Sequence, residues 1–236
     1  MEHNFEKIVL NVPHSSYADA HVEDWSDKDA FVKEVVKWTD WYTDWIFDSK
    51  DPRVDMCKLP MTRFSCDVER LIDDPLEKEG QGIIYTKFNG LVRKQLTEEQ
   101  QRLTMEVYHA YHQLLRSKLT KGTLLIDCHS FPSDLTTDID ICIGYNEDFS
   151  KPSEEVLSLI KCHFLEAGYR VELNKPYSNS IAPKTDFAYS SLMIEINKKC
   201  YLNQPLLPIV NMDKITKLRK TINDLYQILL NADYVK

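Results

Sequence analysis

The chain has 236 residues, of which 43% are hydrophobic and 28% charged, a composition typical of a globular protein with a sizeable core. Its 29 Lys and Arg residues against 37 Asp and Glu residues give a net charge of −8, without a basic cluster. That balance argues against a nucleic-acid-binding surface, although a local group of arginines still suits a small anion. No internal repeat, low-complexity tract or linker interrupts the chain, so we expect one domain over residues 1–236.

The N-terminal segment, the apolar runs and the cysteines predict a cytoplasmic protein without a membrane partner, as the acidic charge predicts one without a nucleic-acid partner. The first residues lack the basic segment and long apolar run of a signal peptide, and no apolar run approaches the length of a membrane span. The six cysteines include no Cys-x-x-Cys pair, which argues against a zinc ribbon or a redox motif. Free thiols in a reducing compartment are therefore expected.

Predicted strands and helices alternate along the chain, which indicates an α/β fold with a largely parallel sheet. In chain order, the apolar patterns predict a strand at 7–12, a helix at 27–49, extended segments around 61–63 and 66–70, a long loop at 73–90 with a short strand at 82–86, a helix at 97–120, strands at 123–129 and 139–145, a helix at 152–167, an extended segment at 169–173, a polar loop at 174–189, a strand at 191–197 and a helix at 212–232. Asp27 is expected to cap the first helix, and Gly168 to end the third.

Three of the predicted strands end in polar side chains. The three clusters are His14-Ser15-Ser16, Asp127-Cys128-His129 and Glu195-Ile196-Asn197. Strand side chains alternate, so Asp127 and His129 are expected on one face and Cys128 on the other. Parallel strands bring their carboxyl ends to one edge of a sheet, so we expect the clusters to meet there. Two histidines and a carboxylate form a catalytic zinc set, and a further carboxylate serves as general base.

Each of these candidates also has a structural interpretation. Taken alone, His14 is as typical of a surface loop as of a cleft. Asp40, beside Trp38 and Trp41, needs a partner, and a backbone amide or an arginine would serve as well as a metal. Glu195 interrupts an apolar strand, where a glutamate is uncommon unless it is paired or catalytic, and this position favours function.

Arginines and a pair of histidines complete the candidates. Arg63 and Arg70 suit an anion, because the planar guanidinium matches a carboxylate; the alternative is structural ion pairs within the acidic segment 67–74. His109 and His112 lie three residues apart on the predicted helix, either as a metal pair or, as the neighbouring tyrosines favour, on a packed face. No dinucleotide fingerprint, phosphate-binding loop or nucleophile elbow occurs.

Seven short motifs run in order from residue 11 to the end of the last predicted strand. They are NVPHSS at 11–16, TDWYTD at 39–44, TR at 62–63 with DVER at 67–70, IDCHSFP at 126–132, DICIG at 140–144, NKPY at 174–177 and IEIN at 194–197. With them the chain resembles the N-formylglutamate amidohydrolases, zinc hydrolases similar in fold to zinc carboxypeptidases and aspartoacylases. The resemblance implies a three-layer, phosphorylase/hydrolase-like fold whose mixed central sheet has helices on both faces. It also implies a Zn²⁺ cofactor and a small N-acyl amino acid as substrate.

The same resemblance implies a role for individual residues. The implied roles are zinc ligand for His14, Asp40 and His129, general base for Glu195, polarisation of the scissile carbonyl for Arg63, and substrate binding for Arg70, Asn174 and Tyr177. Asp40 is implied because the position three residues after His14, where the related carboxypeptidases have their carboxylate ligand, is occupied here by Tyr17.

Three positions depart from the pattern of the family. Glu69 replaces a frequent Asn, Ser16 replaces Gly, and Lys198 replaces an Arg whose bidentate fork a lysine does not reproduce. These three departures do not alter the residues implied to bind the metal, but they leave the identity of the acyl amino acid substrate open. The predicted function is therefore zinc-dependent hydrolysis of an N-formyl or other N-acyl amino acid, with N-formyl-L-glutamate as the first candidate substrate. The alternatives are a zinc hydrolase of peptide or cell-wall amides and a non-catalytic ligand-binding protein.

Overall fold

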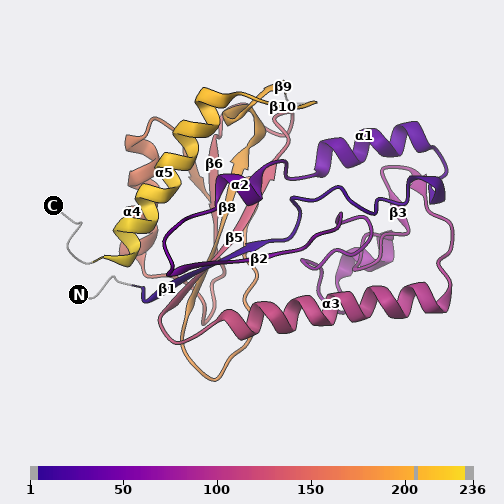
Figure 1. Ribbon diagram of the computed structural model, residues 1–236, viewed down its shortest axis with the longest axis horizontal. Coiled ribbons are helices and arrows are strands. Elements are labelled where there is room, and N and C mark those ends of the chain that lie inside the picture. Colours follow the sequence, from indigo (N-terminus) through magenta and orange to yellow (C-terminus); the bar gives the residue numbers. More distant parts are fainter. Residues whose placement is uncertain (1–4, 205–206, 232–236) are drawn as a thin grey trace.

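The computed structural model, which describes residues 5–204 and 207–231, is built around a six-stranded sheet (Figure 1). Its strands are β1 (Lys7–Val12), β2 (Val54–Lys58), β5 (Thr123–Phe131), β6 (Ile141–Gly144), β7 (Val171–Leu173) and β8 (Ser190–Asn197). Their spatial order is β2-β1-β5-β8-β6-β7. The first four are mutually parallel, whereas β6 runs antiparallel to β8 and parallel to β7. This mixed sheet confirms the expected fold class.

Helices cover both faces of the sheet (Figure 1). Helix α3 (Glu98–Lys118) lies on one face, and α2 (Thr43–Ile46), α4 (Glu154–Glu166) and α5 (Met212–Leu230) lie on the other, whereas α1 (Lys28–Trp38) lies beyond the sheet. On one face, Leu125 of β5 shares a core cluster with Tyr111 and Leu115 of α3. On the other, Ile126 belongs to a cluster that includes Ile222 of α5, as the alternation of strand side chains requires. No helix among the described residues is long and apolar enough to span a bilayer.

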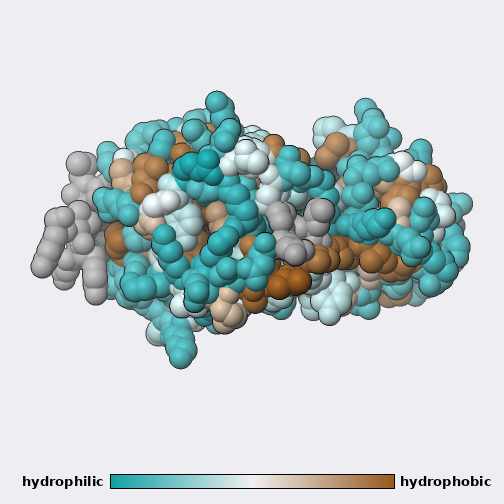
Figure 2. Space-filling model, turned by 90° about the horizontal axis from the view of Figure 1, so that it is seen from above, coloured by the Kyte–Doolittle hydropathy of each residue, from teal (hydrophilic) through white to brown (hydrophobic). Residues whose placement is uncertain are grey.

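A third, aromatic cluster fills the end of the molecule that is remote from both termini (Figure 1). It is formed by residues of α1, of the two-stranded hairpin of β3 (Lys87–Phe88) and β4 (Leu91–Val92), and of the neighbouring loops. Its largest members are Trp25, Phe31, Phe64, Tyr85 and Phe88. Phe64 and Tyr85 pack edge to face with ring centroids 5.4 Å apart. This packing fixes the irregular segment that carries Arg63. Figure 2 shows that polar side chains cover most of the face seen from above.

The helix predicted at 27–49 is interrupted after Trp38. Tyr42 has a left-handed backbone (φ 64°) and separates α1 from α2. Between the two helices the Asp40 amide donates to the carbonyl of His14 (2.9 Å), an interaction that a continuous helix would not allow. The prediction of one long helix is therefore wrong. Phe31 and Val35 of α1 belong to the aromatic cluster, whereas Ile46 of α2 belongs to the core against the sheet.

Three predicted extended segments are also wrong, and one hairpin was missed. The sequence predicts extended segments at 61–63, 66–70 and 82–86, but these residues form turns, with one isolated bridge between Gln81 and Tyr85. Packing of buried side chains, and not hydrogen bonding between strands, stabilises this region. Its apolar residues therefore follow no regular period along the sequence. A hairpin of β9 (Leu202–Gln204) and β10 (Leu207–Val210) was not predicted at all.

The other predicted helices and strands end within two residues of their observed bounds. Asp27 caps α1 by accepting a hydrogen bond from the Ala30 amide, as expected. Gly168, which follows α4, has a φ of 89° and ends that helix in the left-handed conformation that glycine favours. Residue 232, the predicted end of the last helix, lies outside the described residues.

Candidate metal centre and substrate cavity

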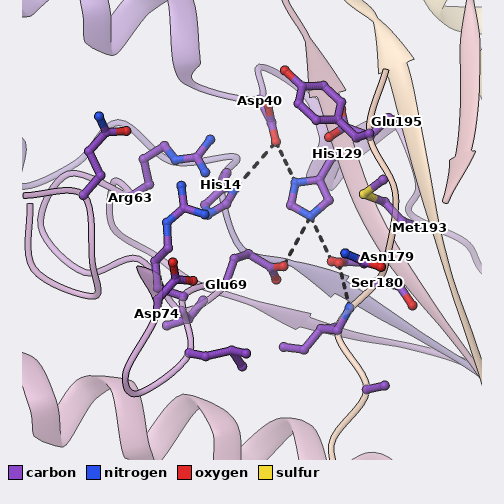
Figure 3. A pocket seen from close by; sticks show the side chains of 18 of the residues that line it. His14, Asp40, Arg63, Glu69, Asp74, His129, Asn179, Ser180, Met193 and Glu195 are labelled. Carbon is purple, nitrogen blue, oxygen red and sulfur yellow. Dashed lines mark hydrogen bonds and ion pairs between the residues drawn. The ribbon is translucent and has the colours of Figure 1, made fainter. Parts of the chain in front are cut away.

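The carboxyl ends of β1, β5 and β8 meet at one edge of the sheet and open into a cavity of about 1000 Å³ (Figure 3). His14 follows β1, His129 lies near the end of β5, and Glu195 lies near the end of β8. In the parallel register of β5 and β8, His129 is directly opposite Glu195. All three side chains line the cavity. The structure therefore brings together the three polar clusters, as the predicted strand directions require.

His14, Asp40 and His129 present three potential ligand atoms to one another (Figure 3). The Nδ1 of His129 lies 3.1 Å from Asp40 Oδ2, and the Nδ1 of His14 lies 3.9 Å from the same oxygen. All three side chains are buried, and His14 Nδ1 has no hydrogen-bond partner among the described residues. An unpartnered, buried imidazole nitrogen beside a carboxylate and a second imidazole fits a metal ion with nitrogen and oxygen ligands.

The second nitrogen of each imidazole is held by an aspartate. His14 Nε2 lies 2.9 Å from Asp67 Oδ1, and His129 Nε2 lies 2.9 Å from Asp127 Oδ1. A carboxylate at Nε2 fixes the ring orientation and directs Nδ1 toward Asp40, an arrangement typical of histidines that bind metals. Both rings are thus positioned for an ion by contacts that lie behind them.

Burial and neighbouring charges set the ionisation of these groups. Burial, assisted by Arg63, lowers the pKa of His14 to about 4, so this imidazole is neutral, as a metal ligand must be. Burial opposes the protonation of His129, but Asp127 and the other carboxylates outweigh it and raise the pKa of His129 well above its usual value. A cation among the three ligand atoms would take the place of that proton.

Glu195 reaches the same cavity without a fixed partner. Its Oε2 is buried and has no hydrogen-bond partner among the described residues. Burial raises the pKa of Glu195 to about 8, which a nearby cation would lower again. Tyr177 also lines this part of the cavity, and burial followed by the charge of Glu195 raises its pKa. A carboxyl group in such surroundings is suited to accept and return a proton near neutral pH.

Arg63 and Arg70 both line the cavity, and both contact Asp67. Arg63 Nη2 lies 3.2 Å from Asp67 Oδ2, and Arg70 Nε lies 3.6 Å from the same oxygen. Tyr85 OH also donates to this oxygen (3.0 Å). The structural ion pairs considered from the sequence therefore exist. Because each guanidinium has five N–H donors and both side chains remain about one-fifth exposed, donors are still available to an anion in the cavity.

Asn174 lies apart from this group. Its backbone is left-handed (φ 54°), and its side-chain oxygen accepts a hydrogen bond from the Tyr145 amide (3.0 Å). It is not among the residues that line the cavity. Its contacts shape the turn after β7 and do not bring it to the site.

A chain of buried polar groups behind His129 was missed by sequence reasoning. Tyr111 OH donates to Asn11 Oδ1 (2.6 Å), and Asn11 Nδ2 lies 2.7 Å from both Asp127 Oδ1 and Glu69 Oε1. Glu69, Asp127 and His129 Nε2 form a second group of potential metal ligands. Burial and the charge of Asp127 raise the pKa of Glu69 well above its usual value. The sequence does contain a signal for this chain of contacts, because Asn11 is a polar residue in the otherwise apolar run that ends β1.

Comparison with known proteins identifies the family of this chain. The profile of the N-formylglutamate amidohydrolase family matches residues 6–202. The chain belongs to this family. Two solved structures show the same fold as this N-formylglutamate amidohydrolase family member. One is N-formylglutamate amidohydrolase from Ralstonia eutropha JMP134, with 17% identity, a TM-score of 0.75, and coverage of 96% of this chain and 95% of that chain.

The other solved structure is the gene product Atu2144 from Agrobacterium tumefaciens, with 14% identity, a TM-score of 0.67, and coverage of 96% of this chain and 91% of that chain. At these identities the likeness establishes the α/β fold of this family member and no more. No curated protein matches the chain significantly.

Proposed function

We propose that the protein is a zinc-dependent amidohydrolase that removes the formyl group, or another small acyl group, from an amino acid, with N-formyl-L-glutamate as the first candidate. The observation that carries the proposal is the convergence of His14 Nδ1, His129 Nδ1 and Asp40 Oδ2 in the cavity that Glu195 also lines. Two imidazoles and a carboxylate are a catalytic zinc set that leaves a position for water. Membership of an amidohydrolase family supports the reaction class.

His14, Asp40 and His129 would hold the ion, which supplies Lewis acidity toward water and the acyl carbonyl when it is bound. Glu195 accepts the proton of the attacking water and returns it to the leaving amine, a role for which its unpartnered, buried oxygen is suited. Arg63 donates N–H groups to the oxygen on which negative charge develops. Asp67 holds this arginine and the His14 ring in fixed positions.

Substrate binding is proposed for Arg70 and Tyr177. Arg70 lines the cavity and is anchored through Asp67 and Tyr85 OH (3.2 Å), so its remaining donors are pre-oriented for a carboxylate. Tyr177 lies at the Glu195 side of the cavity, where its hydroxyl suits the polar part of an acyl amino acid. The position of Asn174 gives no support for a similar role.

Asp127→Asn is expected to weaken zinc binding by about 10–100-fold. The amide keeps the volume of the side chain but removes the charge that orients His129 through its Nε2. Zinc affinity is measured by competition with a chromophoric chelator. Asp138→Asn is the matched control, because the Asp138 side chain is 91% exposed and should not alter the affinity. Equal affinities for Asp127→Asn and the unaltered protein would contradict this orienting role.

The proposed function is tested by measuring formate release with and without a chelator. Purified protein is given N-formyl-glutamate and a panel of other N-formyl amino acids. Release that is abolished by the chelator and restored by added zinc supports the proposal, and the panel ranks the side chains. A protein that binds zinc but releases no formate would move the assignment to larger acyl or peptide amides. Release that is insensitive to the chelator would contradict zinc dependence.

A further inference from the structure

The cavity extends beyond the three ligand atoms to helix α3. Its lining there includes His109, His112 and Arg116 of α3, with Ile72 and Ile181 from the two flanking loops. We refer to the part lined by these five residues as the α3 arm. The whole cavity, about 1000 Å³, is at the upper end of the range for drug-sized ligands, and an N-formyl amino acid is smaller than such ligands. The proposed substrate therefore leaves the α3 arm unfilled.

Both walls of the α3 arm are connected to the residues behind the candidate metal centre. His112 hydrogen-bonds to the backbone of Val68, next to Glu69, while its Nε2 is buried and has no partner among the described residues. On the other wall, the Ile181 amide donates to Asp127 Oδ2 (3.2 Å). The arm is thus a continuation of the site and not a separate surface hollow.

The outer end of the arm carries a positive charge without an acidic partner. Arg116 is exposed and makes no ion pair among the described residues. On the same helix, by contrast, Arg102 is paired with Glu99 (2.7 Å) and with Glu106. In a chain with a net charge of −8, an arginine left unpaired at the edge of a substrate cavity is suited to a carboxylate of the ligand.

We infer that the α3 arm binds a C-terminal extension of the substrate, so that the preferred substrate is an N-formyl or N-acyl dipeptide or tripeptide whose terminal carboxylate pairs with Arg116. This inference rests on the proposed function and names its substrate class. One turn of α3, about 5.4 Å, separates His112 from Arg116, and an extended residue spans about 3.4 Å. One or two residues beyond the acylated one therefore cover that turn. Ile72 and Ile181 provide apolar walls for their side chains.

The extension is tested by binding, which does not require turnover. Zinc-loaded Glu195→Gln protein is titrated calorimetrically with N-formyl-glutamate, N-formyl-glutamyl-leucine and the C-terminal amide of that dipeptide. We expect the free dipeptide to bind at least about 10-fold more tightly than its amide, because only the free acid pairs with Arg116. Arg116→Gln in the same background should bring this ratio to about one, whereas Arg102→Gln should leave it unchanged.

Equal affinity for the dipeptide and its amide, a ratio that Arg116→Gln does not alter, or no binding of any probe would overturn the inference. The unaltered enzyme provides an independent comparison through kcat/KM for N-formyl-glutamate and the dipeptide. Hydrolysis of N-formyl-glutamate without a preference for the free dipeptide would reject the α3 arm and keep the proposed function. Tight binding of the dipeptide without chelator-sensitive hydrolysis would reject the proposed function and keep the arm.

Discussion

Glu195→Gln is expected to lower kcat by about 10²–10⁴-fold and to leave the zinc content of the protein unchanged. Gln has nearly the volume of Glu, so the packing around this buried side chain is preserved. An amide, however, does not accept the proton of the attacking water, and Glu195 Oε2 has no other partner whose loss would disturb the fold. The variant is compared with the unaltered protein by steady-state kinetics and by metal analysis.

The control for this experiment is Glu166→Gln, at the exposed end of α4 and outside the cavity lining. Its kcat and zinc content should match those of the unaltered protein. A Glu195→Gln variant that keeps near-normal kcat would remove Glu195 from the reaction. Loss of zinc together with kcat would instead identify Glu195 as a ligand.

His14→Ala is expected to eliminate both stoichiometric zinc and detectable hydrolysis. Removing one of three protein ligands from a catalytic site takes away a large part of its binding free energy, and the remaining two groups do not define a tetrahedral site. The fold should survive, because Asp67, the partner of His14, keeps its contacts with Arg63, Arg70 and Tyr85. Zinc content is measured after dialysis against buffer with trace zinc, and folding by circular dichroism.

His163→Gln is the matched control, because His163 lies on α4 and its Nε2 contacts the Thr221 carbonyl (2.8 Å), away from the cavity. It should keep about one equivalent of zinc, the content expected for a single catalytic site. A folded His14→Ala protein with full zinc content and activity would show that the ion binds elsewhere.

The strands around the site were predictable because their sequence signals are strong. A continuous apolar run in the sequence predicted β5. The alternation of its side chains correctly placed Asp127 and His129 on one face of the sheet and Cys128 on the other, where Cys128 belongs to the core cluster. The parallel directions of β1, β5 and β8 then brought His14, His129 and Glu195 together without knowledge of any contact.

The contacts that orient these residues were not predictable from local sequence. Asp67 lies 53 positions from His14 in the chain, in an irregular segment without period, so nothing in the sequence pairs the two. Asp40 reaches the site only because the helix ends at Trp38 and the Asp40 amide bonds to the His14 carbonyl. Such long-range hydrogen bonds depend on the packed structure, whereas apolar periodicity reports only which side of an element is buried.

The most direct test of the metal centre is anomalous diffraction from crystals of the zinc-loaded protein. We predict one anomalous peak that lies about 2.0–2.2 Å from His14 Nδ1, Asp40 Oδ2 and His129 Nδ1, with Glu195 nearby but not coordinated. A peak among Glu69, Asp127 and His129 Nε2, the other group of potential ligands, would contradict this account of the site.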